Sequence, residues 1–193
     1  MSSIVISGDT SGQITLAAPA AAGTNTLTLP ALTATVMTNK TAGAVLQVVS
    51  TTKTDAFSTT STVTASGGAL TATGAAVTGL SATITPNSSS SKILVMVTIG
   101  GMNGTAGAAQ AIALLLRGST VIGNGTGSGG RPGINSRGYY NDVNTAVAVS
   151  FSYLDSPATT SSTTYQVNLG TDTASQPAYL NRTQDSQDTI DRK

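Results

Sequence analysis

The sequence predicts an all-β protein: a short N-terminal stem of β-strands followed by a jelly-roll-like β-sandwich. Three observations lead to this fold class. Small and β-branched residues dominate, and charged residues make up only 9% of the chain. Runs of strand length recur between turns rich in Gly, Pro, Asn and Ser. Only one segment has appreciable helix propensity. Seven or more short strands separated by turns are typical of sandwiches and barrels.

Residues 1–42 contain only short β-type runs. These runs lie at residues 4–6, 13–16, 26–29 and 33–38, with turn-rich pieces between the first three. Strands this short do not form a stable sheet within one chain. We therefore expect them to pair with copies of the chain or with a partner, and we interpret residues 39–43 as a joint.

In residues 43–193 the runs lengthen, and we expect a single sandwich domain. Residues 80–85 alternate between apolar and polar side chains, which is the period of a half-buried strand. Residues 92–99 are rich in Val and Ile and are predicted to be covered on both faces. The other predicted strands are residues 45–51, 109–116, 146–154, 163–169 and 178–181, with loops and weak strands over 54–78.

Residues 109–116 have the highest helix propensity, and a helix over 106–116 is the alternative to a strand there. Gly118 and Ser119 favour the strand, because they suit a two-residue type II′ hairpin turn into residues 121–122. Residues 123–144 are Gly-rich and predict a long loop.

This loop carries the side chains that we select as a candidate contact site for a receptor or partner. Tyrosine offers apolar area and a hydroxyl at low entropic cost, which suits contact with a sugar or a protein. The simpler alternative is a loop packed on itself or on a neighbouring subunit. The candidates are Arg131, Arg137, Tyr139 and Tyr140.

The composition argues against catalysis. The chain contains no His, Cys, Trp or Glu, and its eight acidic residues are all Asp. A nucleophilic Ser has no His to act as its base, and thiolate chemistry is absent with Cys. We therefore expect no catalytic residue, cofactor or metal. The nine basic residues are scattered singly, which disfavours nucleic-acid binding.

Two short motifs have simpler interpretations. Residues 125–130 match G-x-G-x-x-G, but Pro132 and its neighbours open no helix, so we expect a mobile surface loop. Asp185, Asp188 and Asp191 are close together as in a calcium loop. Their spacing is not that of an EF-hand and the closing Glu is absent, so a solvated polar tail is the simpler interpretation.

The start of the chain and its apolar runs give no sign of membrane targeting. Residues 1–6 lack a basic region and a long apolar region, so no signal peptide is expected. The longest nearly apolar stretch, residues 93–102, is too short to span a bilayer. A net charge of +1 leaves a weakly charged surface, which favours a protein that works inside an assembly.

Residues 14–30 have the sequence ITLAAPAAAGTNTLTLP. This segment is similar to one common near the N-terminus of phage tail-fibre and related virion proteins, especially those from phages of aquatic bacteria. The resemblance covers most of the chain. Short segments similar to the globular part of the same proteins lie at residues 46–55, 84–86, 91–95, 115–120 and 151–157.

The resemblance implies a homotrimeric fibre or spike with a jelly-roll knob and no catalytic residues. Residues 1–42 would dock on other virion proteins, and the protein would be assembled in the host cytoplasm. The chain departs from the family at residues 188–193, which are polar where the family has a longer apolar closing strand. The candidate anchoring residues are Ile14, Leu16, Leu27, Leu29 and Pro30.

The sequence therefore predicts a trimeric tail fibre or appendage, with a stem over 1–42 and a knob over 43–193. One alternative is a capsid decoration or head-fibre protein. Another is a carbohydrate-binding adhesin that recognises a host glycan or protein through the Tyr-containing loop.

Overall fold

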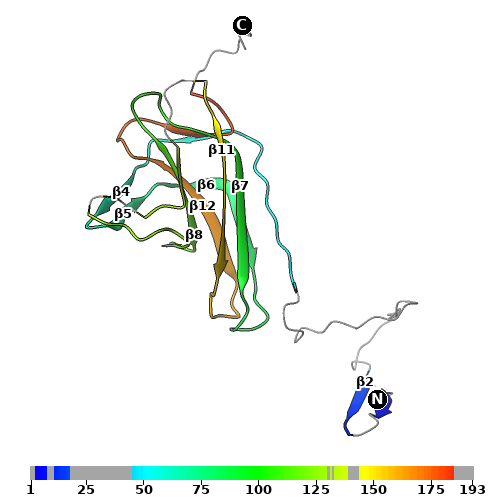
Figure 1. Ribbon diagram of the computed structural model, residues 1–193. Helices are drawn as coiled ribbons and strands as arrows, with labels where there is room; N and C mark the ends of the chain where they lie inside the picture. Colours follow the sequence, from blue (N-terminus) through cyan, green and yellow to red (C-terminus); the bar gives the residue numbers. More distant parts are fainter. Residues whose placement is uncertain are drawn as a thin grey trace. The chain divides into compact units, whose positions relative to one another are not determined.

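The computed structural model describes residues 3–7, 11–17, 45–129, 131, 133–138 and 144–184 (Figure 1). The chain divides into two compact units, Met1–Ala44 and Val45–Lys193. Within the described residues the regular structure consists of antiparallel sheets and contains no helix. The prediction of an all-β fold is confirmed.

The first unit contains one β-hairpin. Strands β1 (Ser3–Ser7) and β2 (Gln13–Ala17) pair antiparallel from Ser3↔Ala17 to Ser7↔Gln13. We expected these runs to pair with copies or a partner, whereas they pair with each other. Ile4, Val5 and Ile6 remain 66%, 50% and 54% exposed, and alternate side chains of a strand point to opposite faces. Among the described residues, apolar side chains on both faces of β1 are therefore at least half exposed.

The second unit has a four-stranded sheet, a five-stranded sheet and a small hairpin. One sheet has the order β11-β7-β13-β3, and the other has the order β10-β8-β12-β6 with β9 added to β8. The first sheet contains β3 (Phe57–Thr59), β7 (Ile93–Asn103), β11 (Val147–Asp155) and β13 (Ala178–Leu180). The second contains β6 (Ala75–Ile84), β8 (Ala111–Arg117), β9 (Thr120–Val121), β10 (Ser136–Gly138) and β12 (Thr163–Thr171). Strands β4 (Val63–Ser66) and β5 (Ala69–Thr73) form the hairpin.

The principal strands pair in nested order. β3 pairs with β13, β6 with β12, β7 with β11, and β8 with β10. The chain in the second unit therefore follows the path of one long antiparallel hairpin that is folded back on itself. The further pairings β12–β8 and β13–β7 join the nested pairs into two sheets.

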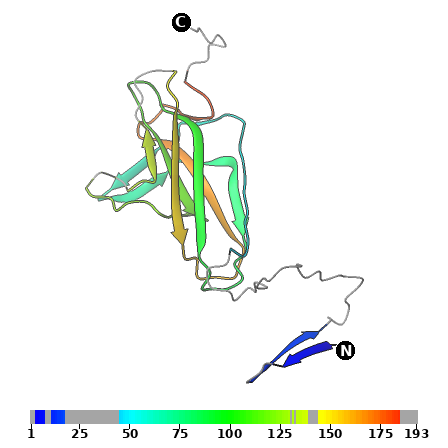
Figure 2. The same ribbon diagram turned by 45° about the vertical axis from the view of Figure 1, so that its right-hand side comes forward.

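The two sheets share one hydrophobic core, which makes the unit sandwich-like. Figure 2 shows β7 and β11 side by side with β12 of the other sheet crossing behind them. The core draws side chains from both sheets because one side of each strand faces inward. Its fully buried members include Met102, Ala113, Leu169 and Leu180.

The structure confirms the strand predictions for residues 80–85 and 109–116 and the turn predicted at Gly118. Leu80, Ala82 and Ile84 are half-buried in β6 and their neighbours are exposed. The apolar run at 109–116 forms β8, which is buried over Ala111–Leu116, and not a helix. Gly118 has φ of +57° in the turn that joins β8 to β9, as a type II′ turn requires.

Three expectations in this unit are wrong. Residues 45–51 are extended but belong to no strand. The Gly-rich region 123–144 contains β10, which pairs with β8. β7 is covered on one face only, since Leu94 and Met96 are 60% and 76% exposed.

The glycine motif lies in a packed loop. A Cβ on Gly127 would lie 2.0 Å from the carbonyl oxygen of Gly68, in the β4–β5 turn, and a Cβ on Gly133 would lie 1.6 Å from that of Gly125. Asn124 also donates from Nδ2 to the carbonyl oxygen of Gly133 at 3.2 Å. These glycines allow backbones to approach closely, so the exposed residues of the surface loop are joined to close backbone contacts at Gly127 and Gly133.

Candidate functional site

One open feature of the second unit is a strand position beside β7. β13 pairs with β7 only at Tyr179↔Asn103 and Leu180↔Met102. Asn181 N then donates to Gly101 O at 2.9 Å, and a φ of +59° turns the chain there. Among the described residues, no strand pairs with residues 93–100 of β7 on the side away from β11.

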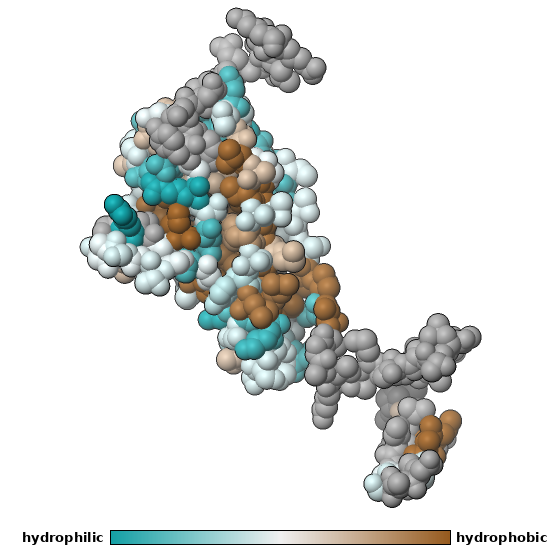
Figure 3. Space-filling model, in the orientation of Figure 1, coloured by the Kyte–Doolittle hydropathy of each residue, from teal (hydrophilic) through white to brown (hydrophobic). Residues whose placement is uncertain are grey.

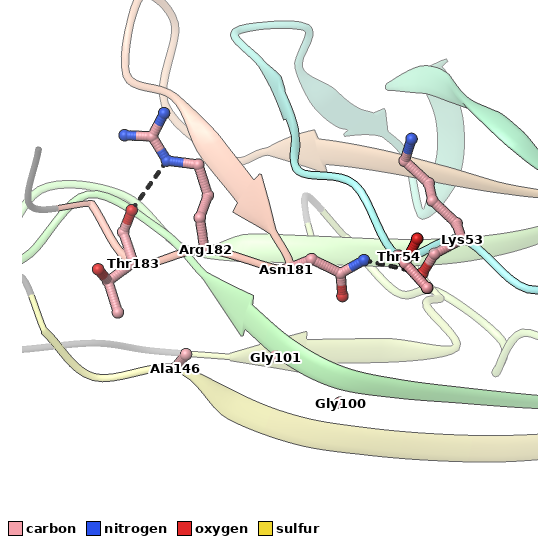
Figure 4. Close-up of a pocket in the computed structure, with 8 residues that line it drawn as sticks. All are labelled: Lys53, Thr54, Gly100, Gly101, Ala146, Asn181, Arg182 and Thr183. Atoms are coloured by element: carbon pink, nitrogen blue, oxygen red, sulfur yellow. Dashed lines mark hydrogen bonds between the residues drawn. The ribbon is translucent and has the colours of Figure 1, made fainter.

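Figure 4 shows the end of this position. Asn181 lies between Gly100–Gly101 of β7 and Lys53–Thr54, and its amide points toward the backbone of the latter. Asn181 Nδ2 donates to Lys53 O at 3.0 Å and to Asp55 O at 3.2 Å. One amide side chain therefore replaces the main-chain bonds that a longer β13 would make.

A groove of about 330 Å³ occupies the position. One wall is β7, and the opposite wall is the extended segment that leads into β3. The core closes the groove from below. Its lining residues are Thr51, Thr52 and Lys53 on the segment, Met96, Thr98, Ile99 and Gly100 on β7, and Leu80, Leu180 and Asn181.

Residues 45–54 form an extended segment without sheet partners. In the part of the chain that the structure describes, they make no backbone–backbone hydrogen bond, and Thr51 Oγ1 donates to Gly79 O at 3.2 Å. Val45 and Val48 are 78% and 81% exposed, and Leu46 and Val49 are also exposed. Such a segment has main-chain groups and apolar side chains available for a partner.

The outward face of β7 and β11 continues this apolar surface. Leu94 lies opposite Leu154 across the two strands, and Met96 lies opposite Ser152. The outward positions of both strands carry only uncharged residues. Figure 3 shows the apolar surface (brown) over the lower part of these strands and at the start of the extended segment.

The residues selected from the sequence are only partly described. Arg131 is exposed, while Tyr139 and Tyr140 lie outside the described residues. Arg137 lies in β10, where Nη2 forms an ion pair with Asp172 Oδ2 at 2.6 Å and Nε donates to Gln110 Oε1. Arg137 therefore links β10 to the residues that precede β8 and follow β12. Of the candidate anchors, Ile14 and Leu16 lie in β2, whereas Leu27, Leu29 and Pro30 lie outside the described residues.

A buried polar cluster joins the two sheets. Arg117 Nη1 donates to both carboxylate oxygens of Asp155 at 2.9 Å, and Tyr165 Oη donates to Asp155 Oδ2 at 2.6 Å. Burial alone would raise the pKa of Asp155, but the hydrogen bonds from Tyr165 and Arg117 hold it below its ordinary value. Burial and the Asp155 charge raise the pKa of Tyr165 well above its ordinary value. The cluster links β11, β8 and β12 and has a structural role.

These shifts predict how stability depends on pH. The lowered pKa of Asp155 stabilises the fold above its unfolded value of about 4, and the stabilisation is lost as pH falls through the folded value. The raised pKa of Tyr165 stabilises the fold below about pH 10, and this is lost as pH rises further. Urea unfolding from pH 3 to 11 should show a plateau between these limits. Asp155→Asn should flatten the acid side, and an unchanged acid slope in that variant would contradict the assignment.

No protein-family model matches this chain, and no curated protein sequence matches it. In the described residues, no helix is long and apolar enough to cross a membrane. The same residues contain no group of three or more His, Cys, Asp or Glu that could hold a metal ion.

The open strand position was not predicted, although the sequence contains two signals for it. Val45 and Leu46 are adjacent apolar residues, and so are Val48 and Val49. An extended segment here therefore has apolar side chains on both faces. The residues that follow Leu180 turn polar at the point where a closing strand would continue. Together these signals indicate a sheet that its own chain leaves incomplete.

Proposed function

We propose that this chain is a non-enzymatic structural protein of a phage virion: a trimeric tail fibre or appendage. Residues 1–42 attach it to other virion proteins, and residues 43–193 form the displayed knob. The single observation that supports an assembling role is the incomplete β7 sheet. It combines an open strand position with an uncharged apolar face, as expected of a subunit that is completed by other chains.

The strand order supports a jelly roll in particular. Eight strands pair first with last, second with next-to-last, and so on inward, and they contribute four strands to each of two sheets, one of which gains β9 at β8. This is the order of a jelly roll, a fold found in viral capsid and lectin domains. The assignment to phages rests on the sequence segments that resemble tail-fibre proteins.

The mass of the full chain in solution tests this proposal. We expect three times the chain mass of 19.1 kDa by light scattering at micromolar concentration. A closed three-fold ring satisfies every copy of an interface equally, so the mass should not grow with concentration. A folded monomer would contradict the trimer. Imaging of parent particles with the protein labelled should place it on tail fibres or appendages.

The two alternatives have different signatures in the same experiments. A capsid decoration protein would label the head at high copy number. An adhesin would bind defined sugars on a glycan array, and Arg131→Ala should weaken that binding. Arg137 is a weaker candidate for glycan contact because Asp172 and Gln110 already engage its guanidinium.

A further inference from the structure

We propose that the open position beside β7 is a strand-acceptor site filled by an extended strand from a second copy of this chain. The donor segment is residues 45–50. The inference rests on the proposed function, because it names the interface that would hold the oligomer together. Main-chain hydrogen bonds supply affinity in this mode of binding, and alternate side chains supply specificity.

The position has the dimensions of one strand. β3 and β7 are both partners of β13, so they lie two strand spacings apart, about 10 Å. Past Leu180 the two walls continue as residues 51–54 and 93–100, and in the described chain no strand lies between them. Each wall presents main-chain groups that no sheet partner takes up. The floor consists of Leu80, Ile99 and Leu180.

The chain's own C-terminal residues do not suit this position. Ala178 and Leu180 point into the core, so alternation would direct residues 182, 184, 186 and 188 inward as well. These residues are Arg182, Gln184, Ser186 and Asp188. Placing an unpaired guanidinium and an unpaired carboxylate over an apolar floor is costly. The left-handed Asn181 also directs the chain away from the position.

Residues 45–50 of a second copy meet the requirements. They are extended, they lie outside the lining of their own groove, and they make no described backbone–backbone bond. Val45, Leu46, Val48 and Val49 are apolar on both faces of the segment. That pattern suits a strand covered by the acceptor's core on one face and by a neighbouring subunit on the other.

Charge does not oppose the approach of a second copy. The outward positions of β7 and β11 are uncharged, and the exposed apolar residue Met96 lines the groove. Lys53, the one charged lining residue, is paired with Asp55 at 2.6 Å. When each copy donates its strand to the next, the contact is head-to-tail, and a rotation of one third of a turn between copies closes such contacts into a trimeric ring.

The first test places a charge in the acceptor. Met96→Lys should convert the trimer into a folded monomer of 19.1 kDa with an unchanged far-ultraviolet circular dichroism spectrum, because Met96 is 76% exposed within one copy. Ser81→Lys is the matched control, with the same charge on the exposed outward face of β6. It should leave the threefold mass unchanged. A Met96→Lys protein that remains trimeric would overturn the acceptor site.

The second test identifies the donor strand. The chain has no Cys, so Thr98→Cys introduces a single thiol into the groove for a benzophenone photo-crosslinker. Light and ¹⁵N-labelled chains are mixed unfolded, refolded together and irradiated. We expect crosslinks from position 98 to residues 45–50 within the tryptic peptide 41–53, with light–heavy pairs at the statistical share. Fragment spectra separate them from same-chain crosslinks to residues 51–53, which line the groove. Ser81→Cys should give no light–heavy crosslink to residues 45–50.

The outcomes separate this inference from the proposed function. A trimer whose crosslinked pairs are always of one isotope means that each chain fills its own groove, and a trimer whose crosslinks reach another segment means a different donor. Either result overturns this inference and leaves the trimeric fibre intact. A wild-type chain that is monomeric overturns both.

Discussion

Replacing Asp155 with Ala is expected to lower the free energy of unfolding by about 2–4 kcal/mol. The carboxylate is 5% exposed and accepts three hydrogen bonds from side chains, two from Arg117 and one from Tyr165. Its removal leaves the buried Tyr165 hydroxyl without its acceptor and Arg117 without its counter-ion. The Arg117 side chain keeps 33% of its exposure, so water compensates part of the loss.

Urea unfolding near pH 7 measures this effect, with all variants at one protein concentration because oligomerisation contributes to stability. Tyr165→Phe is the matched variant, since it removes one hydrogen bond and is expected to cost about 1 kcal/mol. The double variant should cost less than the sum of the two. Additive losses would show that the three groups do not act as one cluster.

Leu169→Ala is expected to cost about 2–5 kcal/mol. Leu169 is fully buried in the core, and its backbone is paired with Ala113 on one side and Ala75 on the other. A central strand held on both sides cannot move to fill the cavity, and both paired residues are small. The loss should therefore lie toward the upper part of that range.

Thermal or urea unfolding checks the result, with Leu169→Met as the matched control. That substitution roughly conserves volume and is expected to cost less than about 1.5 kcal/mol. If Ala and Met have equal effects, the site tolerates a cavity, and Leu169 is not a packing centre of the core.

The parts of the fold that were predicted correctly depend on local sequence. The alternation in β6 reports one buried face, whatever lies opposite. Gly118–Ser119 fixes the turn after β8, because glycine readily adopts the positive φ that the turn requires. The helix propensity of residues 109–116 is overridden because both faces of β8 are buried.

The parts that were missed depend on distant residues. β10 is only three residues long in a Gly-rich region, and its neighbour Asn135 accepts a bond from Leu115 N at 2.9 Å and donates to Ile122 O at 3.0 Å. No local sequence pattern predicts these hydrogen bonds. Residues 45–51 have the composition of a strand, but a strand also needs a neighbour, which the described part of the chain does not provide.

The candidate site shows the same division. Arg137 was selected for the Gly-rich loop in which it lies, yet its partners Gln110 and Asp172 come from distant parts of the chain and give it a structural role. The acceptor position is defined by where β13 stops. The composition indicated a protein that works inside an assembly. Only the strand pairing of β7 shows where the open position lies.

The nested pairing has a consequence for the order of events during synthesis. β3, near residue 57, finds its partner β13 only when residue 178 has been made. Contacts so distant in sequence make folding slow, because a large loop must close before they form. The sheet that borders the acceptor position therefore completes last. Leu180 and Asn181 also line the groove beside β7, so the groove takes its final form only after β13 has paired.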